Sequence, residues 1–173
     1  MSNIVYDKSK AIETILYLAK KISNPSKLNI CKMIYHADKL SLVKYGRLIF
    51  GGEYCAMKHG PVPSEAYDLL KEYIQHPVEF KVDAKNPYRV TALRDANLDY
   101  LSESDQECLE QTMRQYDGAW EKMYQDAHDA AWEETWNNKS GSSNSVRMTL
   151  HSIVNTLPDS ADLLDYLTEC GVC

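Results

Sequence analysis

The 173-residue sequence lacks the features that mark membrane-spanning, secreted and nucleic-acid-binding proteins. It has no apolar run of about 18 residues, the length that a membrane-spanning helix needs, and no signal-peptide pattern. It also has no arginine-rich run and no zinc-finger spacing. Its net charge of -6 opposes direct contact with nucleic acid or an anionic membrane. We therefore expect a cytoplasmic protein with no direct nucleic-acid or membrane partner.

The common catalytic signatures are absent too. The sequence contains none of the motifs G-x-S-x-G, G-x-x-x-x-G-K-[ST], H-E-x-x-H and G-x-G-x-x-G. Its five cysteines are an odd number without a secretory signal, which indicates reduced thiols. Cys170 and Cys173 form a C-x-x-C, but no further zinc ligands stand near them in the sequence. These absences favour a protein that is not an enzyme and that uses no metal or cofactor.

What remains is the composition of a globular protein of one domain, with 44% hydrophobic and 25% charged residues. The spacing of the apolar residues and the local capping signals predict helices at 8–22, 26–45, 65–75, 102–116, 119–137 and from 158 onward. Short extended stretches predict strands at 48–50, 53–56, 78–82 and 88–92, the last two as an antiparallel pair. The expected fold class is mainly α with a small antiparallel β element (α+β), a compact helical domain built round a central buried helix.

The stretch at 26–45 is the expected central helix, because apolar residues lie almost all round it. It stops at Gly46, which tolerates the left-handed conformation that ends helices. Asp38 falls within its apolar stripe, where a carboxylate needs donors, a cation or a proton. We expect Asp38 to hold the following loop, through backbone N–H groups of residues 57–63 or through Lys58. A solvent-facing Asp38 at a helix edge and a ligand-binding Asp38 are the alternatives.

Residues 59–63 cannot be helical, because Pro61 and Pro63 each hold the preceding residue in extended geometry. We interpret the stretch as a stiff connector, with Gly51-Gly52 as a tight turn before it and Ser64 as the cap of the next helix. Further along, His128 and Trp132 are four residues apart and would share a helix face. The commoner explanation is a histidine stacked on a core tryptophan, with one ring nitrogen bonded to backbone; a functional site is the other.

We expect a domain at 1–136 and an extension at 137–173, which begins with a Ser/Asn/Gly-rich loop at 137–145 and continues as a C-terminal helical part. We expect the extension to tune partner choice. Its terminal helix has one apolar side and can dock either on its own domain or on a partner.

The stretch from Tyr35 to Pro63 resembles the Panacea domain, also called the SocA-like antitoxin domain or the phage-associated GepA-like family. The family pattern is a helix ending in Y-x-A-D, a later glycine, then G-x-x-Y/F-x-A-x-x-x-G-P-V-P, an L-S at a helix start and a His followed closely by Trp. In this chain the pattern corresponds to Tyr35, Ala37, Asp38, Gly46, Gly51, Tyr54, Ala56, Gly60, Pro61, Val62, Pro63, Leu101-Ser102, His128 and Trp132. These motif residues, with Lys58 and His59 beside the Gly-Pro pair, are the candidate partner- or ligand-binding residues.

The resemblance implies a mostly helical domain with a small sheet, often encoded beside a toxin gene or in a prophage. Members bind and neutralise protein toxins, and one branch acts as a proteolytic adaptor. Our first hypothesis is accordingly an antitoxin with a protein toxin as partner; a homo-oligomer is left open. A phage-encoded inhibitor of a host defence protein is the second hypothesis. The third is a small-molecule-binding or enzymatic domain that brings Asp38, Tyr54, Lys58 and His128 into one pocket.

Overall fold

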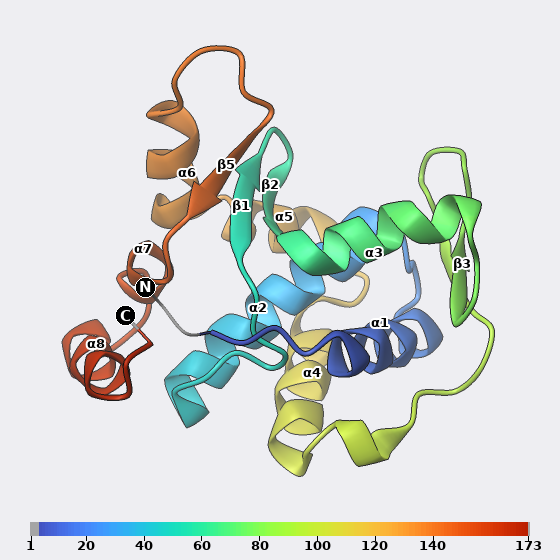
Figure 1. Ribbon diagram of the computed structural model, residues 1–173, viewed down its shortest axis with the longest axis horizontal. Coiled ribbons are helices and arrows are strands. Elements are labelled where there is room, and N and C mark those ends of the chain that lie inside the picture. Colours follow the sequence, from blue (N-terminus) through green and yellow to red (C-terminus); the bar gives the residue numbers. More distant parts are fainter. Residues whose placement is uncertain (1–3, 173) are drawn as a thin grey trace.

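The computed structural model describes residues 4–172 (Figure 1). Within this range the chain is mainly helical and carries two small antiparallel sheets, which confirms the expected fold class. The elements follow in the order α1 (Lys8–Lys21), α2 (Lys27–Tyr45), β1 (Tyr54–Met57), β2 (Gly60–Pro63), α3 (Ser64–Gln75), β3 (Phe80–Val82), β4 (Val90–Ala92), the 3-10 turn η1 (Leu98–Tyr100), α4 (Glu103–Tyr116), α5 (Trp120–Ala127), α6 (Ala130–Asn137), β5 (Ser145–Met148), α7 (Leu150–Val154) and α8 (Ser160–Glu169). None of the helices in the described range has the length and hydropathy needed to cross a membrane.

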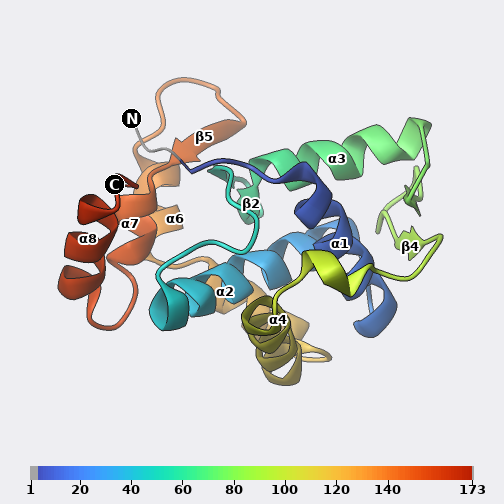
Figure 2. The same cartoon turned by 60° about the horizontal axis from the view of Figure 1, so that its bottom comes forward.

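Helix α2 lies at the centre of the molecule, as its apolar sequence predicts (Figures 1 and 2). The side-chain oxygen of Ser26 caps it by accepting a bond of 3.1 Å from the backbone N–H of Asn29. Gly46 ends it in the left-handed conformation, with φ at 63°. Residues 29–38 are all buried, because α3, α4, α5 and strand β2 pack around this part of the helix.

The three-stranded sheet has the order β2-β1-β5 and differs from the expected strands. Residues 60–63, expected as a stiff connector, are strand β2 and pair with β1 in a hairpin, with Tyr54 opposite Pro63. Residues 48–50, expected as a strand, form a loop. Gly51 and Gly52 both have positive φ and do not close a hairpin between the two expected strands, so that prediction was wrong. Instead, the backbone N–H of Ile49 donates to the side chain of Asp38 in α2, and the carbonyl oxygen of Phe50 accepts a bond from the backbone N–H of Asp7.

The helix expected at 119–137 is two helices, α5 and α6, with a break at His128 and Asp129. The carboxylate of Asp129 caps α6 by accepting a bond of 3.2 Å from the N–H of Trp132, so a new helix begins there. His128 therefore lies in the break. The prediction that it shares a helix face with Trp132 was wrong. Ser64 is likewise the first residue of α3 and not its cap.

Other local predictions are confirmed. Strands β3 and β4 pair antiparallel, with Phe80 opposite Ala92. Helix α4 begins with a capping box, in which Ser102 and Asp105 each accept a bond from the other's backbone N–H. It ends at Tyr116, before Asp117 and Gly118.

The segment after residue 137 docks on its own domain. Strand β5 adds to the free side of β1, with Ala56 opposite Val146, and α7 and α8 follow beside the far end of α2 (Figures 1 and 2). Residues before position 137 and residues of this segment together form a second hydrophobic cluster, which is separate from the main core. Its buried members are Tyr35, Leu42, Tyr54, Ala56, Ala127, Ala131, Met148, Ile153, Val154, Leu157 and Leu167.

Candidate functional site

Asp38 is buried in the middle of the molecule and is bonded only to neutral donors. The backbone N–H of Ile49 donates to Oδ1 and the Tyr54 hydroxyl donates to Oδ2, both at 2.7 Å. Burial raises the pKa of Asp38 to about 6, although these two bonds act in the opposite direction. The expectation that Asp38 holds the next loop by hydrogen bonds is confirmed for Ile49. The expectation that it binds residues 57–63 or Lys58 was wrong.

The β1–β2 hairpin is held by two other side chains. The Lys32 ammonium donates to the carbonyl oxygen of Pro61 at 2.7 Å, and the Trp132 indole donates to the carbonyl oxygen of Met57 at 2.9 Å. Lys32 is fully buried, and no carboxylate of residues 4–172 pairs with it. Burial lowers its pKa to about 8. Sequence reasoning missed Lys32, although a lysine inside a largely apolar helix segment was a visible signal.

Gly60 allows this close approach. Its φ is +99°, and a Cβ atom there would lie 2.8 Å from Nζ of Lys32 and 3.1 Å from Cε1 of His128. A side chain would therefore meet both groups while also straining the backbone. The glycine of the G-P-V-P motif is thus explained by packing between α2, the hairpin and the α5–α6 break.

His128 and Trp132 interact although they do not share a helix. The two rings meet edge to face with centroids 4.3 Å apart. Nδ1 of His128 lies 2.6 Å from the carbonyl oxygen of Tyr124, to which it donates. The expected backbone bond of one histidine nitrogen is therefore present, whereas the rings meet edge to face and not stacked, and Trp132 is half-buried and not a core residue.

A chain of contacts links Asp38 to α6. The ring of Tyr54 meets that of Tyr35 edge to face at 5.2 Å, and the Tyr35 hydroxyl donates to Asp129 at 2.7 Å. Lys39 pairs with the same carboxylate oxygen of Asp129 at 2.7 Å. Burial raises the pKa of both tyrosines well above the usual value, so they are neutral donors. The network fixes the relative position of α2, β1 and α6.

The four residues of the expected polar pocket are not brought together. Asp38 and Tyr54 are in contact, whereas Lys58 is exposed in the hairpin turn and makes no hydrogen bond or ion pair with any described residue. His59 is exposed beside it. His128 lies against Gly60 and Lys32 instead.

The remaining motif residues are buried or closely packed. Ala56, Pro61, Val62 and Pro63 are buried in the hairpin. A Cβ at Gly51 would lie 2.2 Å from the carbonyl oxygen of Val5, so the N-terminal segment packs closely over this glycine.

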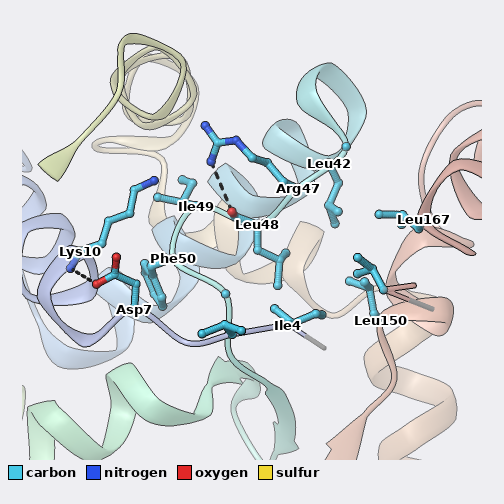
Figure 3. Close-up of a pocket in the computed structure, with 14 residues that line it drawn as sticks. Ile4, Asp7, Lys10, Leu42, Arg47, Leu48, Ile49, Phe50, Leu150 and Leu167 are labelled. Carbon is cyan, nitrogen blue, oxygen red and sulfur yellow. Dashed lines mark hydrogen bonds between the residues drawn. The ribbon is translucent and has the colours of Figure 1, made fainter. Parts of the chain in front are cut away.

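Two adjoining hollows, of about 360 and 450 Å³, lie between the loop after α2 and the C-terminal segment. Both are lined by Ile4, Leu48, Leu150 and Val172, and Figure 3 shows several of the apolar side chains around the first hollow. Tyr54 lines the second, but neither includes Asp38, Lys58 or His128. Across the described range, no three His, Cys, Asp or Glu side chains are grouped as metal ligands would be. Most of the motif residues thus lie in the interior, where they hold α2, the β1–β2 hairpin and α6 together.

Comparison with known families agrees with the motif. The family model described as antitoxin SocA-like, Panacea domain, matches residues 30–147, which run from α2 to β5. No curated protein and no solved structure matches the chain. The family match includes the Asp38 network, the hairpin and its contacts with α6, and it confirms the resemblance. The chain therefore belongs to the antitoxin SocA-like, Panacea domain family.

Proposed function

We propose that the protein is an antitoxin-like interaction module that binds a partner toxin and neutralises it. The family match over residues 30–147 carries this proposal. Support comes from the placement of the motif residues, most of which are buried in the interior. A partner would therefore meet the surface that this interior holds rigid. The net charge of -6 suits a basic partner, such as a toxin that handles nucleotides or RNA.

Co-expression with the product of the adjacent gene tests the proposal. Both proteins are placed under separate inducible promoters in a heterologous bacterium, and growth and complex formation are measured. We expect the protein to restore growth and to elute with its partner as one complex. An unrelated acidic protein of similar size and charge is the control, because it should give neither result. Toxicity without rescue, together with separate elution, would contradict the proposal for that partner.

The same strains distinguish two ways of neutralising a toxin. A proteolytic adaptor shortens the lifetime of its toxin, whereas a masking antitoxin leaves the toxin intact in a complex. A pulse-chase measurement of the toxin, with and without the protein, reports the difference. We expect an intact toxin, because a rigid binding surface is sufficient to cover an active site.

A further inference from the structure

The C-terminal end of α2 differs from the rest of the helix because apolar side chains there face solvent. Val43 is 46% exposed and Tyr45 38% exposed. Tyr166 of α8 is 49% exposed, and its ring lies so close to Gly46 that a Cβ there would be 2.5 Å from Cε1. These residues line one hollow of about 380 Å³ between the end of α2 and helix α8, which lie side by side in Figures 1 and 2. Three of the large exposed apolar side chains therefore meet at one place.

The hollow is also acidic. Asp159 and Asp162 line it, are exposed, and form no ion pair with any residue that the structure describes. Its one lysine, Lys44, is already engaged by Glu107 at 2.6 Å and Gln111 at 2.8 Å. The carboxyl end of α2 adds partial negative charge, because its last carbonyl groups point toward this end.

The negative charge continues along α8. Asp162, Asp165, Tyr166 and Glu169 are spaced at three, four and seven residues, so they share one exposed helix face. From Met148 onward the sequence has four acidic residues and no lysine or arginine. Leu164 and Leu167 lie on the other side of α8, where Leu167 is buried in the second cluster, and Leu163 lies between the two sides and also lines the hollow. Helix α8 thus docks by its apolar side and presents an acidic, tyrosine-bearing face.

We propose that this acidic hollow between α2 and α8 docks an arginine-bearing, basic segment of a partner protein. A guanidinium stacks on tyrosine rings and pairs with carboxylates in a planar fork, and the hollow offers both kinds of group side by side. Its volume is near the lower end of the range of about 300 to 1,000 Å³ for ligand pockets, enough for one or two side chains. A second copy of the chain is a poor occupant, because a symmetric contact would bring identical acidic faces together. That the natural partner is a toxin rests on the proposed function.

A peptide titration tests the surface without knowledge of that partner. The full chain, labelled with ¹⁵N, is titrated with Ac-Gly-Arg-Gly-Arg-Gly-amide, and with the matching glutamate peptide as a control. We expect shifts confined to residues 43–46 and 158–169 with the arginine peptide, and none with the glutamate peptide. Absent shifts, or shifts spread over acidic residues elsewhere, would overturn the proposal.

Two variants with the same change of charge sharpen the titration. Asp162→Lys reverses a charge in the hollow, and Asp83→Lys makes the same change at an exposed position after β3, at the other end of the molecule (Figure 1). We expect affinity for the arginine peptide to fall at least tenfold for Asp162→Lys and to change less than twofold for Asp83→Lys. Equal effects would show general electrostatic attraction and would overturn the proposal. A thermal melt checks that both variants fold.

The co-expression assay then separates this inference from the proposed function. If the wild-type chain rescues growth, we expect Asp162→Lys to fail while Asp83→Lys succeeds. Rescue by Asp162→Lys would overturn the docking surface and leave the antitoxin proposal standing. If the wild-type chain fails to rescue, the antitoxin proposal fails for that toxin, and the peptide titration still decides the docking surface.

Discussion

The two ends of helix α2 differ in burial, and this difference separates a role in stability from the proposed role in recognition. Residues 29–38 are buried on all sides, and the charged groups Lys32 and Asp38 are bonded to the hairpin and to the next loop. At the other end Val43 and Tyr45 face solvent beside carboxylates that have no cationic partner in residues 4–172. Changes in the first part should therefore act on folding. Changes in the second part should act on binding and leave folding nearly unaffected.

The largest effect should come from removing residues 138–173, which cover one side of α2. This deletion takes away five buried side chains of the second cluster: Met148, Ile153, Val154, Leu157 and Leu167. Each contributes about 1.5 to 3 kcal/mol when buried, so the sum rivals the total stability of a domain. We expect the shortened protein to lose its cooperative thermal transition, measured by circular dichroism.

A cleavage control separates loss of the segment from loss of chain continuity. A protease site inserted at Gly141, which has open space around it, allows the segment to be cut but not removed. We expect the cleaved pieces to stay together and to melt cooperatively. If the deleted protein kept its cooperative melt, the segment would be dispensable for folding, and its expected role in partner choice would gain support.

The next effect concerns Asp38 and depends on pH. Because burial raises its pKa to about 6, the folded state binds a proton between about pH 3.8 and 6 that the unfolded state releases. The stability contributed by Asp38 is therefore full below about pH 3.8 and is lost as pH rises through about 6. The shift corresponds to about 3 kcal/mol. The stability advantage of the wild type over Asp38→Asn should shrink by most of this amount between pH 4 and pH 7.

Urea unfolding at pH 4, 5, 6 and 7 measures this difference directly. Asp83→Asn is the control, because it makes the same chemical change at an exposed side chain. A pH-independent difference for Asp38→Asn would mean that Asp38 has an ordinary pKa in the folded protein, because the bonds from its two neutral donors balance its burial.

Gly60→Ala should differ from its matched control by a smaller amount. The left-handed backbone alone costs an alanine about 1 to 2 kcal/mol. At Gly60 the new methyl group must also displace the Lys32 ammonium or the His128 ring, which lie within 3.1 Å of it. Gly141→Ala is the matched control, since its φ is +66° and nothing lies within 4 Å. We expect Gly60→Ala to lose about 1 to 2 kcal/mol more in urea unfolding; equal losses would mean that Lys32 and His128 adjust freely.

The sequence predicted the elements that depend on local signals. Ser26 and Gly46 mark the ends of α2, the alternation around β3 and β4 marks a strand pair, and Ser102 with Asp105 marks the start of α4. Strand β5 carried no comparable signal, because it follows a Ser/Asn-rich loop and acquires its extended form by pairing with β1 far away in the chain. The break at Asp129 had a local cap that the continuous apolar spacing concealed.

For the candidate site too, the sequence predicted what depends on local pattern and not what depends on distant parts of the chain. That Asp38 is buried and must be hydrogen-bonded followed from its place in an apolar stripe. Which donors it meets depends on how the loop at Ile49 and the strand at Tyr54 fold back, and no local spacing encodes that. The same holds for Lys32, whose acceptor is the carbonyl oxygen of Pro61, a backbone group with no sequence signature. The acidic hollow joins residues more than 100 positions apart in the chain.

The smallest effect on stability should come from Val43→Ser, at the exposed end of α2. Val43 is 46% exposed, so its replacement should change the free energy of unfolding by no more than about 0.5 kcal/mol. Because Val43 lines the acidic hollow, affinity for the arginine peptide should nevertheless fall about threefold, corresponding to about 0.7 kcal/mol. Val78→Ser is the matched control, with the same chemical change at a residue that is 66% exposed and lies outside the hollow. If both variants bound like the wild type, Val43 would have no part in docking and the acidic groups would act without it. If Val43→Ser unfolded the protein, the two ends of α2 would not differ in their contribution to folding.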